Sequence, residues 1–240
     1  MCTVLLRFQP DAGWPLLLGA VRDELLDRAW DPPGRHWGGA VVGGRDRVSG
    51  GTWLAVDPER SQVAFVLNGV PPSASRARSR GELPLHALAG AGLPADLSGY
   101  ATFHLALASP TAVRVWSWDG TQLLDRSLEP GDHLLVNLGL DTDTDPLVPH
   151  FRPLLAKADD PPVTGAGTEQ AWGDWVALLA GDGLAGDDPR ALIVRRRFAG
   201  RSYGSSSASL VALRPGGIRY DFTALTGTGQ PVASWRPVLP

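Results

Sequence analysis

Short runs of apolar and β-branched residues, separated by Gly, Pro, Asp and Ser, recur along almost the whole chain. Such runs are typical of β-strands, and the separating residues are typical of turns. A Gly-containing turn at residues 118–120 also predicts a hairpin between two of the runs. We expect strands at residues 3–8, 16–21, 52–56, 63–67, 103–108, 113–118, 122–128, 133–138, 207–213, 218–222 and 233–238.

Helical periodicity is limited to three stretches, residues 83–89, 149–158 and 168–180. Pro84 restricts the first to a short helix that starts near that residue. Thr168 is the expected N-cap of the third, whose single apolar stripe we interpret as core. That stripe consists of Trp172, Trp175, Val176 and Leu179. Many strands with a few separately placed helices predict the α+β class.

Length and charge limit the kinds of protein that the chain can be. At 240 residues it is expected to form a single domain, residues 1–240, with a substantial core. The net charge of −3 gives no overall basic field, so we expect no nucleic-acid partner. The apolar run at residues 15–21 is too short to span a bilayer and lacks a basic leader. We therefore expect no membrane insertion and a cytoplasmic location; the oligomeric state stays open.

No motif for a metal or cofactor is complete. A single cysteine excludes an intramolecular disulfide and multi-cysteine metal sites, and the five histidines lack ligand spacing. Residues 141–145 begin like a calcium loop, but Pro146 and Arg152 replace its required Gly and Glu. We interpret this acidic run as a turn that caps the next helix. We expect no metal and, for an enzyme, no cofactor.

A near match to the serine-hydrolase elbow also fails. Residues 204–208 read Gly-Ser-Ser-Ser-Ala, ending in Ala where that motif has Gly. The residues that follow predict a strand where the elbow requires a helix. Ser206 is therefore excluded as a nucleophile.

The one thiol of the chain, Cys2, directly follows Met1. A lone cysteine placed at random would rarely fall there, and the simplest explanation is chance or a small residue at the start of a strand. A functional explanation is that removal of Met1 gives Cys2 a free α-amine. The thiol titrates near pH 8.5 and the amine at about 7.7–8.0, so the amine can accept the thiol proton without a histidine.

Three charged residues, Arg22-Asp23-Glu24, follow the second expected strand. An antiparallel return from the first strand would bring them beside Cys2. A carboxylate there can orient the α-ammonium, and an arginine favours the thiolate. A charged turn after the strand is the alternative, and spacing alone leaves both interpretations open.

Several motifs in order resemble the NRDE family, also called the transport and Golgi organisation protein 2 family. The resemblance begins with Met1-Cys2 and the segment Val21-Arg22-Asp23-Glu24, and runs to about residue 220. The other motifs are Gly50-Gly51-Thr52-Trp53-Leu54, Leu67-Asn68-Gly69, Ser79-Arg80-Gly81-Glu82, Val136-Asn137-Leu138-Gly139-Leu140-Asp141 and Tyr203-Gly204-Ser205-Ser206-Ser207.

The resemblance implies an N-terminal-nucleophile hydrolase fold, a four-layer αββα sandwich with two antiparallel sheets between helical layers. It implies that Cys2 is nucleophile and base, that Asp23 holds the α-amine, and that Arg22 sets the local charge. It also implies that Asn68 is an oxyanion donor and that Asn137 is a partner of the amine or the oxyanion. Without the resemblance, each asparagine is interpreted as a turn residue at a strand end.

Two substrate-binding residues are expected, Trp53 and Ser206. Trp53 belongs to a group of tryptophans that could line an apolar acyl pocket, although core packing is the alternative; the others are Trp14, Trp30 and Trp37. Ser206 stands where the family has Arg, Val21 where it has Asn, and Leu67 where it has Thr. If those groups contact the substrate, this member has a changed specificity or has lost part of the activity.

Two functions follow from these expectations. The first is a cysteine hydrolase that cleaves a non-peptide, linear amide bond of a small acylated molecule. The second is a haem- or lipid-binding protein that uses the same cleft for trafficking without turnover. A small molecule is the expected partner in the first case, and haem is the cofactor considered in the second.

Overall fold

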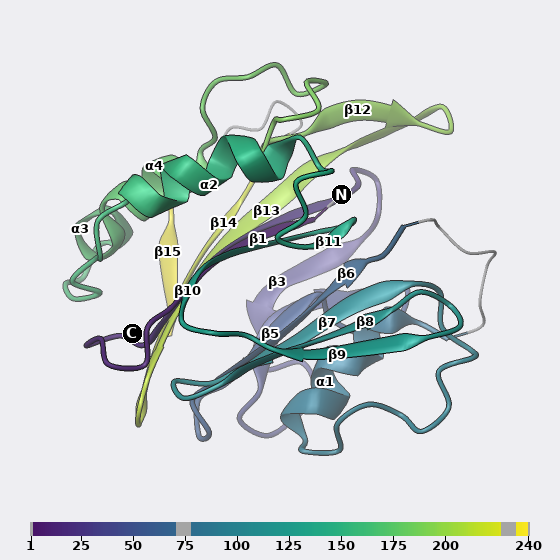
Figure 1. The fold of residues 1–240 in the computed structure, drawn as a ribbon, viewed down its shortest axis with the longest axis horizontal. Coiled ribbons are helices and arrows are strands. Elements are labelled where there is room, and N and C mark those ends of the chain that lie inside the picture. The colour runs from purple at the N-terminus through teal and green to yellow at the C-terminus, as the bar shows by residue number, and fades with distance from the viewer. Residues whose placement is uncertain (1, 71–77, 227–233, 240) are drawn as a thin grey trace.

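The computed structural model describes residues 2–70, 78–226 and 234–239. Within these residues the strands form two sheets, and every strand pair is antiparallel (Figure 1). Sheet A has the order β11 (Gly139–Leu140), β10 (Gly131–Val136), β1 (Thr3–Phe8), β2 (Leu16–Leu25), β13 (Arg201–Arg214), β14 (Gly217–Ala224) and β15 (Arg236–Leu239), with β12 (Arg195–Phe198) paired to β13. Sheet B has the order β3 (Trp30–Gly34), β4 (Val42–Asp46), β5 (Leu54–Asp57), β6 (Gln62–Asn68), β7 (Phe103–Ala108), β8 (Val113–Trp118) and β9 (Leu123–Ser127).

The two sheets pack face to face over a shared apolar layer. Leu6 and Leu18 of sheet A belong to the same buried cluster as Val56 and Phe65 of sheet B. Leu5, which precedes Leu6 in β1, points to the opposite face of sheet A and packs in a second cluster. Because both faces of β1 and β2 are covered, these strands are almost continuously apolar instead of alternating.

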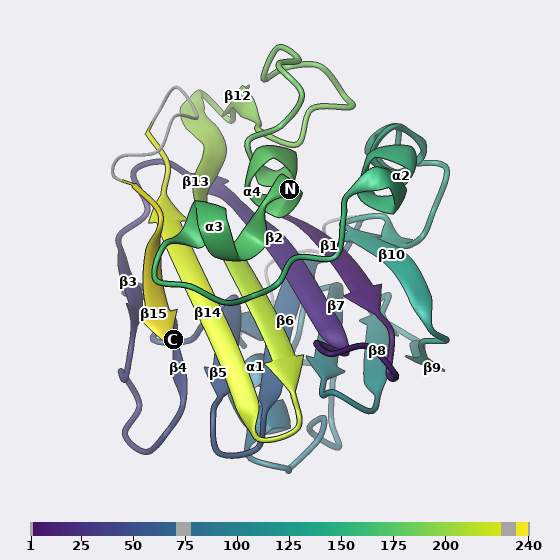
Figure 2. The same cartoon turned by 90° about the vertical axis from the view of Figure 1, so that its left-hand side faces the viewer.

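Helices cover the two outer faces. Three of them, α2 (Leu147–Lys157), α3 (Thr168–Trp172) and α4 (Asp174–Leu179), lie over sheet A, and α1 (Leu83–Leu88) lies over sheet B (Figures 1 and 2). A single turn of 3-10 helix, Arg80–Glu82, precedes α1. The chain is therefore α+β with the expected αββα layers. None of its described helices has both the length and the apolar character needed to cross a membrane.

All the strands expected from the sequence are observed. Those at residues 3–8, 103–108 and 113–118 have the expected bounds, and the others have shifted ends; Ala233, in the last expected strand, lies outside the described residues. The hairpin of β8 and β9 is also confirmed. Four of the described strands are unexpected, β3, β4, β11 and β12. Of these, β3 and β4 contain residues that favour turns, Pro32 and Pro33 in one and Gly43 and Gly44 in the other. Prolines are tolerated in β3 because it is an edge strand. A Cβ at Gly43 would lie 2.7 Å from that of Ala55, so close packing requires glycine there.

The helix expected at residues 168–180 is wrong as a single element. It is interrupted at Gly173, whose φ of 49° is unfavourable for other residues, and α3 and α4 lie on either side. Thr168 is not the N-cap; Gly167 occupies that position. The Thr168 hydroxyl instead donates to the buried Asp221 carboxylate over 2.6 Å. The apolar stripe is core as expected, because both of its tryptophans are fully buried.

Candidate active site

Cys2 directly precedes β1, which lies between β2 and β10. The register pairs Thr3 with Val21 on one side and Val4 with Leu135 on the other. Continued to Cys2, the same register places Arg22 opposite it on β2 and Asn137 opposite it beyond β10. The strand pairing thus brings three of the expected site residues together.

The charged segment 22–24 is part of β2 and not a turn, because β13 continues to pair with it as far as Leu25. Alternation along the strand sends Arg22 into the space between the sheets and Asp23 toward the helical face. The alternative of a charged turn is wrong. One strand therefore supplies a cation and a carboxylate on opposite sides of sheet A, both next to Cys2.

The Arg22 side chain is buried against aromatic rings. Its guanidinium lies 4.3 Å from the ring centroid of Trp53 and 5.8 Å from that of Trp30, and Nη1 donates to Ser206 Oγ over 2.9 Å. Trp53 can pack there because Gly44 has no side chain; a Cβ at that position would lie only 2.2 Å from the Trp53 ring. Burial lowers the pKa of Arg22, and the charges of Cys2 and Glu24 oppose that shift. Arg22 thus places a positive charge beside the thiol.

The Asp23 carboxylate is buried on the other face and accepts a hydrogen bond from Ser205 Oγ at 2.5 Å. Burial raises the pKa of Asp23, while Ser205 and the charge of Arg195 act against that shift. The backbone carbonyl of Asp23 accepts from Tyr203 Oη at 3.1 Å and from Cys2 Sγ at 3.7 Å. A bulge in β13 between Ser205 and Ser207 allows this arrangement.

Cys2 is partly exposed and packs against the core between the sheets. Burial raises the pKa of its thiol, the charge of Asp23 raises it further, and Arg22 lowers it. Since the thiol is held in its protonated form, a nearby base must remove the proton before the sulfur can attack.

The Cys2 cavity has a volume of about 420 Å³ and a wall that is mainly polar. Trp53 is the one tryptophan among the residues that line it, so the expected aromatic acyl pocket does not form around it. Trp14 instead stacks with Arg214, and Trp37 Nε1 donates to the carbonyl of Gly50. The charged residues that line the Cys2 cavity are Arg22, Asp23, Glu24, Arg28, Asp46, Arg78 and Arg80.

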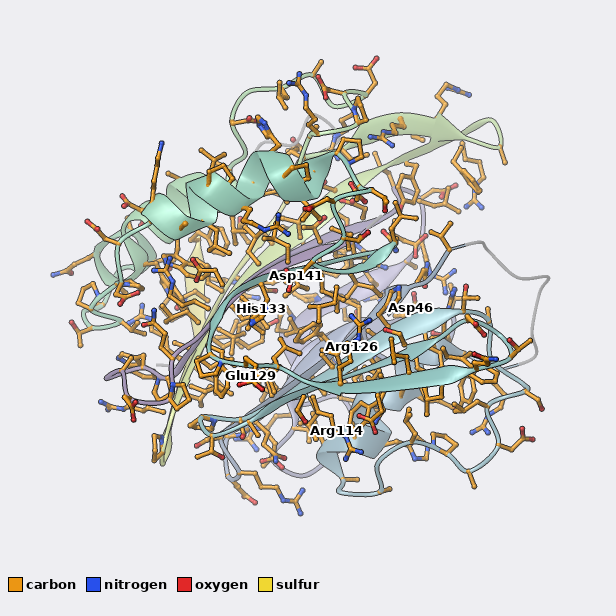
Figure 3. The ribbon with its side chains drawn as sticks, viewed as in Figure 1. Asp46, Arg114, Arg126, Glu129, His133 and Asp141 are labelled. Carbon is orange, nitrogen blue, oxygen red and sulfur yellow. The ribbon has the colours of Figure 1, made fainter. Side chains whose placement is uncertain are left out.

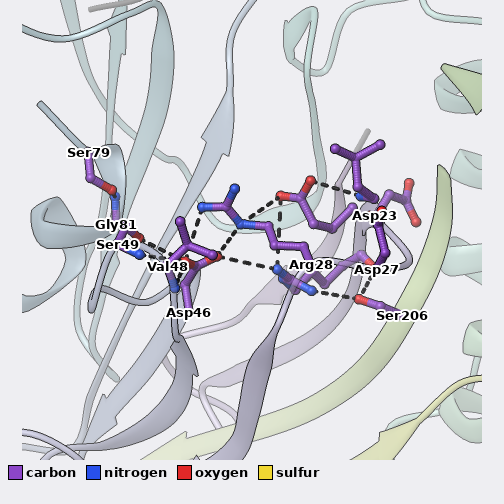
Figure 4. Close-up of polar contacts among 12 residues, drawn as sticks. Asp23, Asp27, Arg28, Asp46, Val48, Ser49, Ser79, Gly81 and Ser206 are labelled. Atoms are coloured by element: carbon purple, nitrogen blue, oxygen red, sulfur yellow. Dashed lines mark hydrogen bonds and ion pairs between the residues drawn. The ribbon is translucent and has the colours of Figure 1, made fainter. Parts of the chain in front are cut away.

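An ion-pair network forms one side of the cavity (Figure 4). Arg28 binds Asp46 through two hydrogen bonds of 2.5 and 3.0 Å, and Asp46 also accepts from the backbone N–H groups of Val48 and Ser49. Glu24 lies 3.9 Å from the guanidinium groups of both Arg22 and Arg28. No sequence pattern indicated Arg28 or Asp46, because they lie in segments that only the fold brings together.

Residues 78–81 also line the cavity, and Ser79 and Gly81 lie beside the Asp46 end of this network (Figure 4). The Ser79 hydroxyl accepts from Gly81 N, and the Gly81 carbonyl accepts from Thr52 N at 2.8 Å. A Cβ at Gly51 would lie 2.4 Å from the Gly81 backbone, so this close approach requires glycine. Arg80 Nη1 donates to the Thr102 carbonyl over 2.9 Å. These contacts bring together two motifs that are distant in sequence, at residues 50–54 and 79–82.

The two candidate asparagines contact each other. Asn137 Nδ2 donates to the Asn68 carbonyl over 2.5 Å, and the buried Asn137 Oδ1 has no partner among the described residues. The Asn137 carbonyl lies 3.1 Å from His104 Nε2. Asn68 ends β6 with an exposed side chain that lines the Cys2 cavity. Asn68 therefore lines the cavity directly, whereas Asn137 does not line it and contacts Asn68.

Ser206 was expected to bind substrate, but it does not line the Cys2 cavity. Its side chain is buried and both of its hydrogen bonds are to Arg22, one from Nη1 and one to the carbonyl. Its neighbour Ser205, which binds Asp23, was missed because no pattern distinguishes serines within the run 205–207.

The acidic run that begins at Asp141 makes contacts with neighbouring protein groups. Asp141 accepts from His133 Nδ1 at 2.7 Å and from Leu134 N at 2.8 Å (Figure 3). Asp145 accepts from Leu147 N at the start of α2, as expected for an acidic turn before a helix. In the part of the chain that the structure describes, no three His, Cys, Asp or Glu side chains are grouped for metal binding.

A comparison with known families identifies what the chain is similar to. The family model described as "Transport and Golgi organisation 2" matches residues 1–145. That range contains Cys2, the charged segment of β2, both candidate asparagines and all of sheet B. No curated protein matches the chain.

Proposed function

The chain belongs to the transport and Golgi organisation 2 family, and on that premise we propose that it is a cysteine amide hydrolase. The proposed substrate is a small acylated molecule with a linear, non-peptide amide bond. The proposed nucleophile is Cys2 after removal of Met1, in a cytoplasmic protein whose thiol stays reduced. The observation that carries the proposal is the position of Cys2, which lines the cavity and whose sulfur contacts the backbone carbonyl of Asp23.

The first half of the reaction forms a thioester. The α-amine of Cys2 takes the thiol proton, and Sγ attacks the carbonyl carbon of the amide. Negative charge develops on the carbonyl oxygen, where the Asn68 side chain donates a hydrogen bond. The ammonium then protonates the leaving nitrogen, the C–N bond breaks, and the amine product departs.

The second half releases the acid. Water gives a proton to the free α-amine and attacks the thioester carbonyl carbon. The C–S bond breaks, the carboxylic acid departs, and the thiolate regains its proton from the ammonium. Asp23 and Asn137 Oδ1, which has no hydrogen-bond partner among the described residues, are the acceptors proposed to hold that ammonium in both halves.

The test uses an alkyl β-lactone, which a thiolate opens to a thioester without a leaving group. Since Cys2 is the only cysteine, a mass gain of one lactone that is absent from Cys2→Ala reports on this thiol. We expect rapid acylation of the native protein, none of Cys2→Ala, and at least a hundredfold slower acylation when two residues precede Cys2. Equal rates for the native and extended proteins would show that the α-amine is not the base.

Alkylation by iodoacetamide provides the control, because it requires the thiolate but no positioned amine. The extended protein should keep this reactivity, which shows that its thiol is still accessible. The alternative function, binding of haem or a lipid without turnover, predicts a saturable haemin or lipid titration together with no acylation by the lactone.

A further inference from the structure

Four arginines line the Cys2 cavity, and three of them face carboxylates. Arg28 binds Asp46, and Arg78 Nε donates to Glu82 Oε1 over 2.9 Å. Arg22 lies 3.8 Å from Asp46 and 3.9 Å from Glu24. These charges are largely balanced within the protein.

Arg80 differs from the other three. Its guanidinium donates to the Thr102 carbonyl, and no carboxylate in the described ranges lies within ion-pair distance of it. The undescribed segments 71–77 and 227–233 contain no Asp or Glu that could supply one. Burial lowers the pKa of Arg80, whereas the charges of Glu24 and Cys2 raise it. Arg80 is thus a half-buried cation close enough to the nucleophile to interact with its charge.

The cation is also held in place. Residues 78–82 are fixed against Gly51 and Thr52, and one guanidinium nitrogen is fixed by the Thr102 carbonyl. The remaining N–H groups of a guanidinium can bind two oxygens of a carboxylate or phosphate at once. Glu24 is a carboxylate whose charge acts on Arg80. It lies within 3.9 Å of both Arg22 and Arg28, and their positive charges offset its repulsion of a bound anion.

We propose that Arg80 binds an anionic group of the substrate, so that the amide cleaved at Cys2 carries a carboxylate or a phosphate near its scissile bond. This inference rests on the proposed function for the identity of the reacting bond. The anion itself is recognised by the cavity whether or not Cys2 turns the ligand over. Arg80 is therefore a specificity-determining residue.

The test compares three ligands that share one hexanoyl amide and differ in the polar group. They are N-hexanoylglycine, N-hexanoylglycinamide and N-hexanoyl-O-phosphoethanolamine. Binding is measured by calorimetry in Cys2→Ala protein, alone and combined with Arg80→Gln, Arg80→Lys or Arg35→Gln. Arg35 is the matched control because it is exposed, donates to the Gly39 carbonyl over 2.9 Å, and does not line the cavity.

We expect an anionic ligand to bind at least tenfold more tightly than the neutral glycinamide. Arg80→Gln should weaken anion binding about 10- to 100-fold, since hydrogen bonds to charged groups have that effect, and leave glycinamide binding unchanged. Arg80→Lys should retain part of the preference, and Arg35→Gln all of it. Comparison of the two anions tells whether the carboxylate or the phosphate is the group recognised.

Three results would overturn the inference: equal binding of anionic and neutral ligands, a preference that survives Arg80→Gln, or no binding of any ligand. Unchanged glycinamide binding shows that Arg80→Gln protein is folded. Because no turnover is involved, a retained anion preference in a protein whose Cys2 fails the lactone test would refute the hydrolase alone.

Discussion

Arg22 and Asp23 are neighbours in β2, and their side chains leave the strand on opposite faces. Arg22 reaches the cavity side, where the Cys2 sulfur also lies, while Asp23 reaches the buried hydrogen bond with Ser205. Each of the two charges therefore acts on the thiol from a different side. Their effects on the thiol pKa have opposite signs.

These signs give the first prediction. Asp23→Asn removes a negative charge that favours the protonated thiol, so the thiolate of Cys2 should form at lower pH than in the native protein. Arg22→Gln removes a cation that favours the thiolate, so its thiolate should form at higher pH. The iodoacetamide rate measured against pH reports both shifts, because only the thiolate reacts.

Arg35→Gln is again the control, since Arg35 lies outside the Cys2 cavity. Its profile should coincide with that of the native protein. A shift of Asp23→Asn and Arg22→Gln in the same direction would contradict the assignment of opposite charges to the two sides of the thiol.

The sequence predicted the residues whose placement depends on one hairpin. Cys2 and the charged segment of β2 meet because two consecutive antiparallel strands bring them together. Asn137 reaches the same place through β10, which is distant in sequence, and only the family resemblance indicated it. The roles of three further residues depend on contacts between separate segments, and neither spacing nor composition distinguishes them from ordinary surface residues. They are Arg28, Asp46 and Ser205.

At the scale of elements, Asp221 explains how α3 is attached to sheet A. This fully buried carboxylate on β14 accepts from Thr168 Oγ1, from Trp172 Nε1 at 2.8 Å, and from Arg219 Nε at 2.7 Å. The break at Gly173 lets α3 present both Thr168 and Trp172 to it while α4 continues over the sheet.

Asp221→Ala should therefore lower the free energy of unfolding by about 3–5 kcal/mol, because it leaves a buried arginine and two donors without their acceptor. Urea unfolding followed by tryptophan fluorescence measures the change. Asp125→Ala is the control, since Asp125 forms an exposed ion pair with Arg114 and its loss should have little effect. Similar losses in the two variants would contradict the role given to Asp221.

His133 on β10 and Asp141 beyond β11 give a pH-dependent contact. The hydrogen bond to Asp141 raises the pKa of His133 in the folded protein, and burial opposes that shift. Its stabilising contribution is fully present below the unfolded pKa of about 6.5, and is lost as pH rises through the folded value.

His133→Asn should thus destabilise the protein more at about pH 5.5 than at about pH 9, as measured by urea midpoints at both values. His86→Asn, on the exposed side of α1, controls for the loss of a histidine as such. An equal loss at both pH values would show that the protonated ring gains nothing from Asp141.

Element prediction succeeded where apolar patterning was strong and failed where local composition imitated a turn. β1 lies inside sheet A and β6 inside sheet B, and both have apolar runs that can be recognised directly in the sequence. β3 and β4 contain Pro and Gly for reasons of edge position and close packing, and β12 consists mainly of arginines. The periodicity of Trp172 and Trp175 predicted one continuous helix, but Gly173 divides it into α3 and α4.

For the whole molecule, the cavity requires both sheets. Sheet A supplies Arg22 from β2, and Cys2 directly precedes β1 of the same sheet. Sheet B supplies Asn68 from β6, and Trp53 directly precedes β5. The stacking of Arg22 on Trp53 joins the two walls. The αββα layering itself was predicted from the family resemblance, because strand spacing gave no information on how β2 pairs with the distant β13.

If Cys2 acts as the first residue of the chain, the intact mass of the natively expressed protein after β-lactone treatment will show it. We predict a chain that lacks Met1 and carries one acyl group on Cys2. A chain that retains Met1 and is nevertheless acylated at the same rate, or one that begins at Cys2 and is not acylated, would contradict the claim.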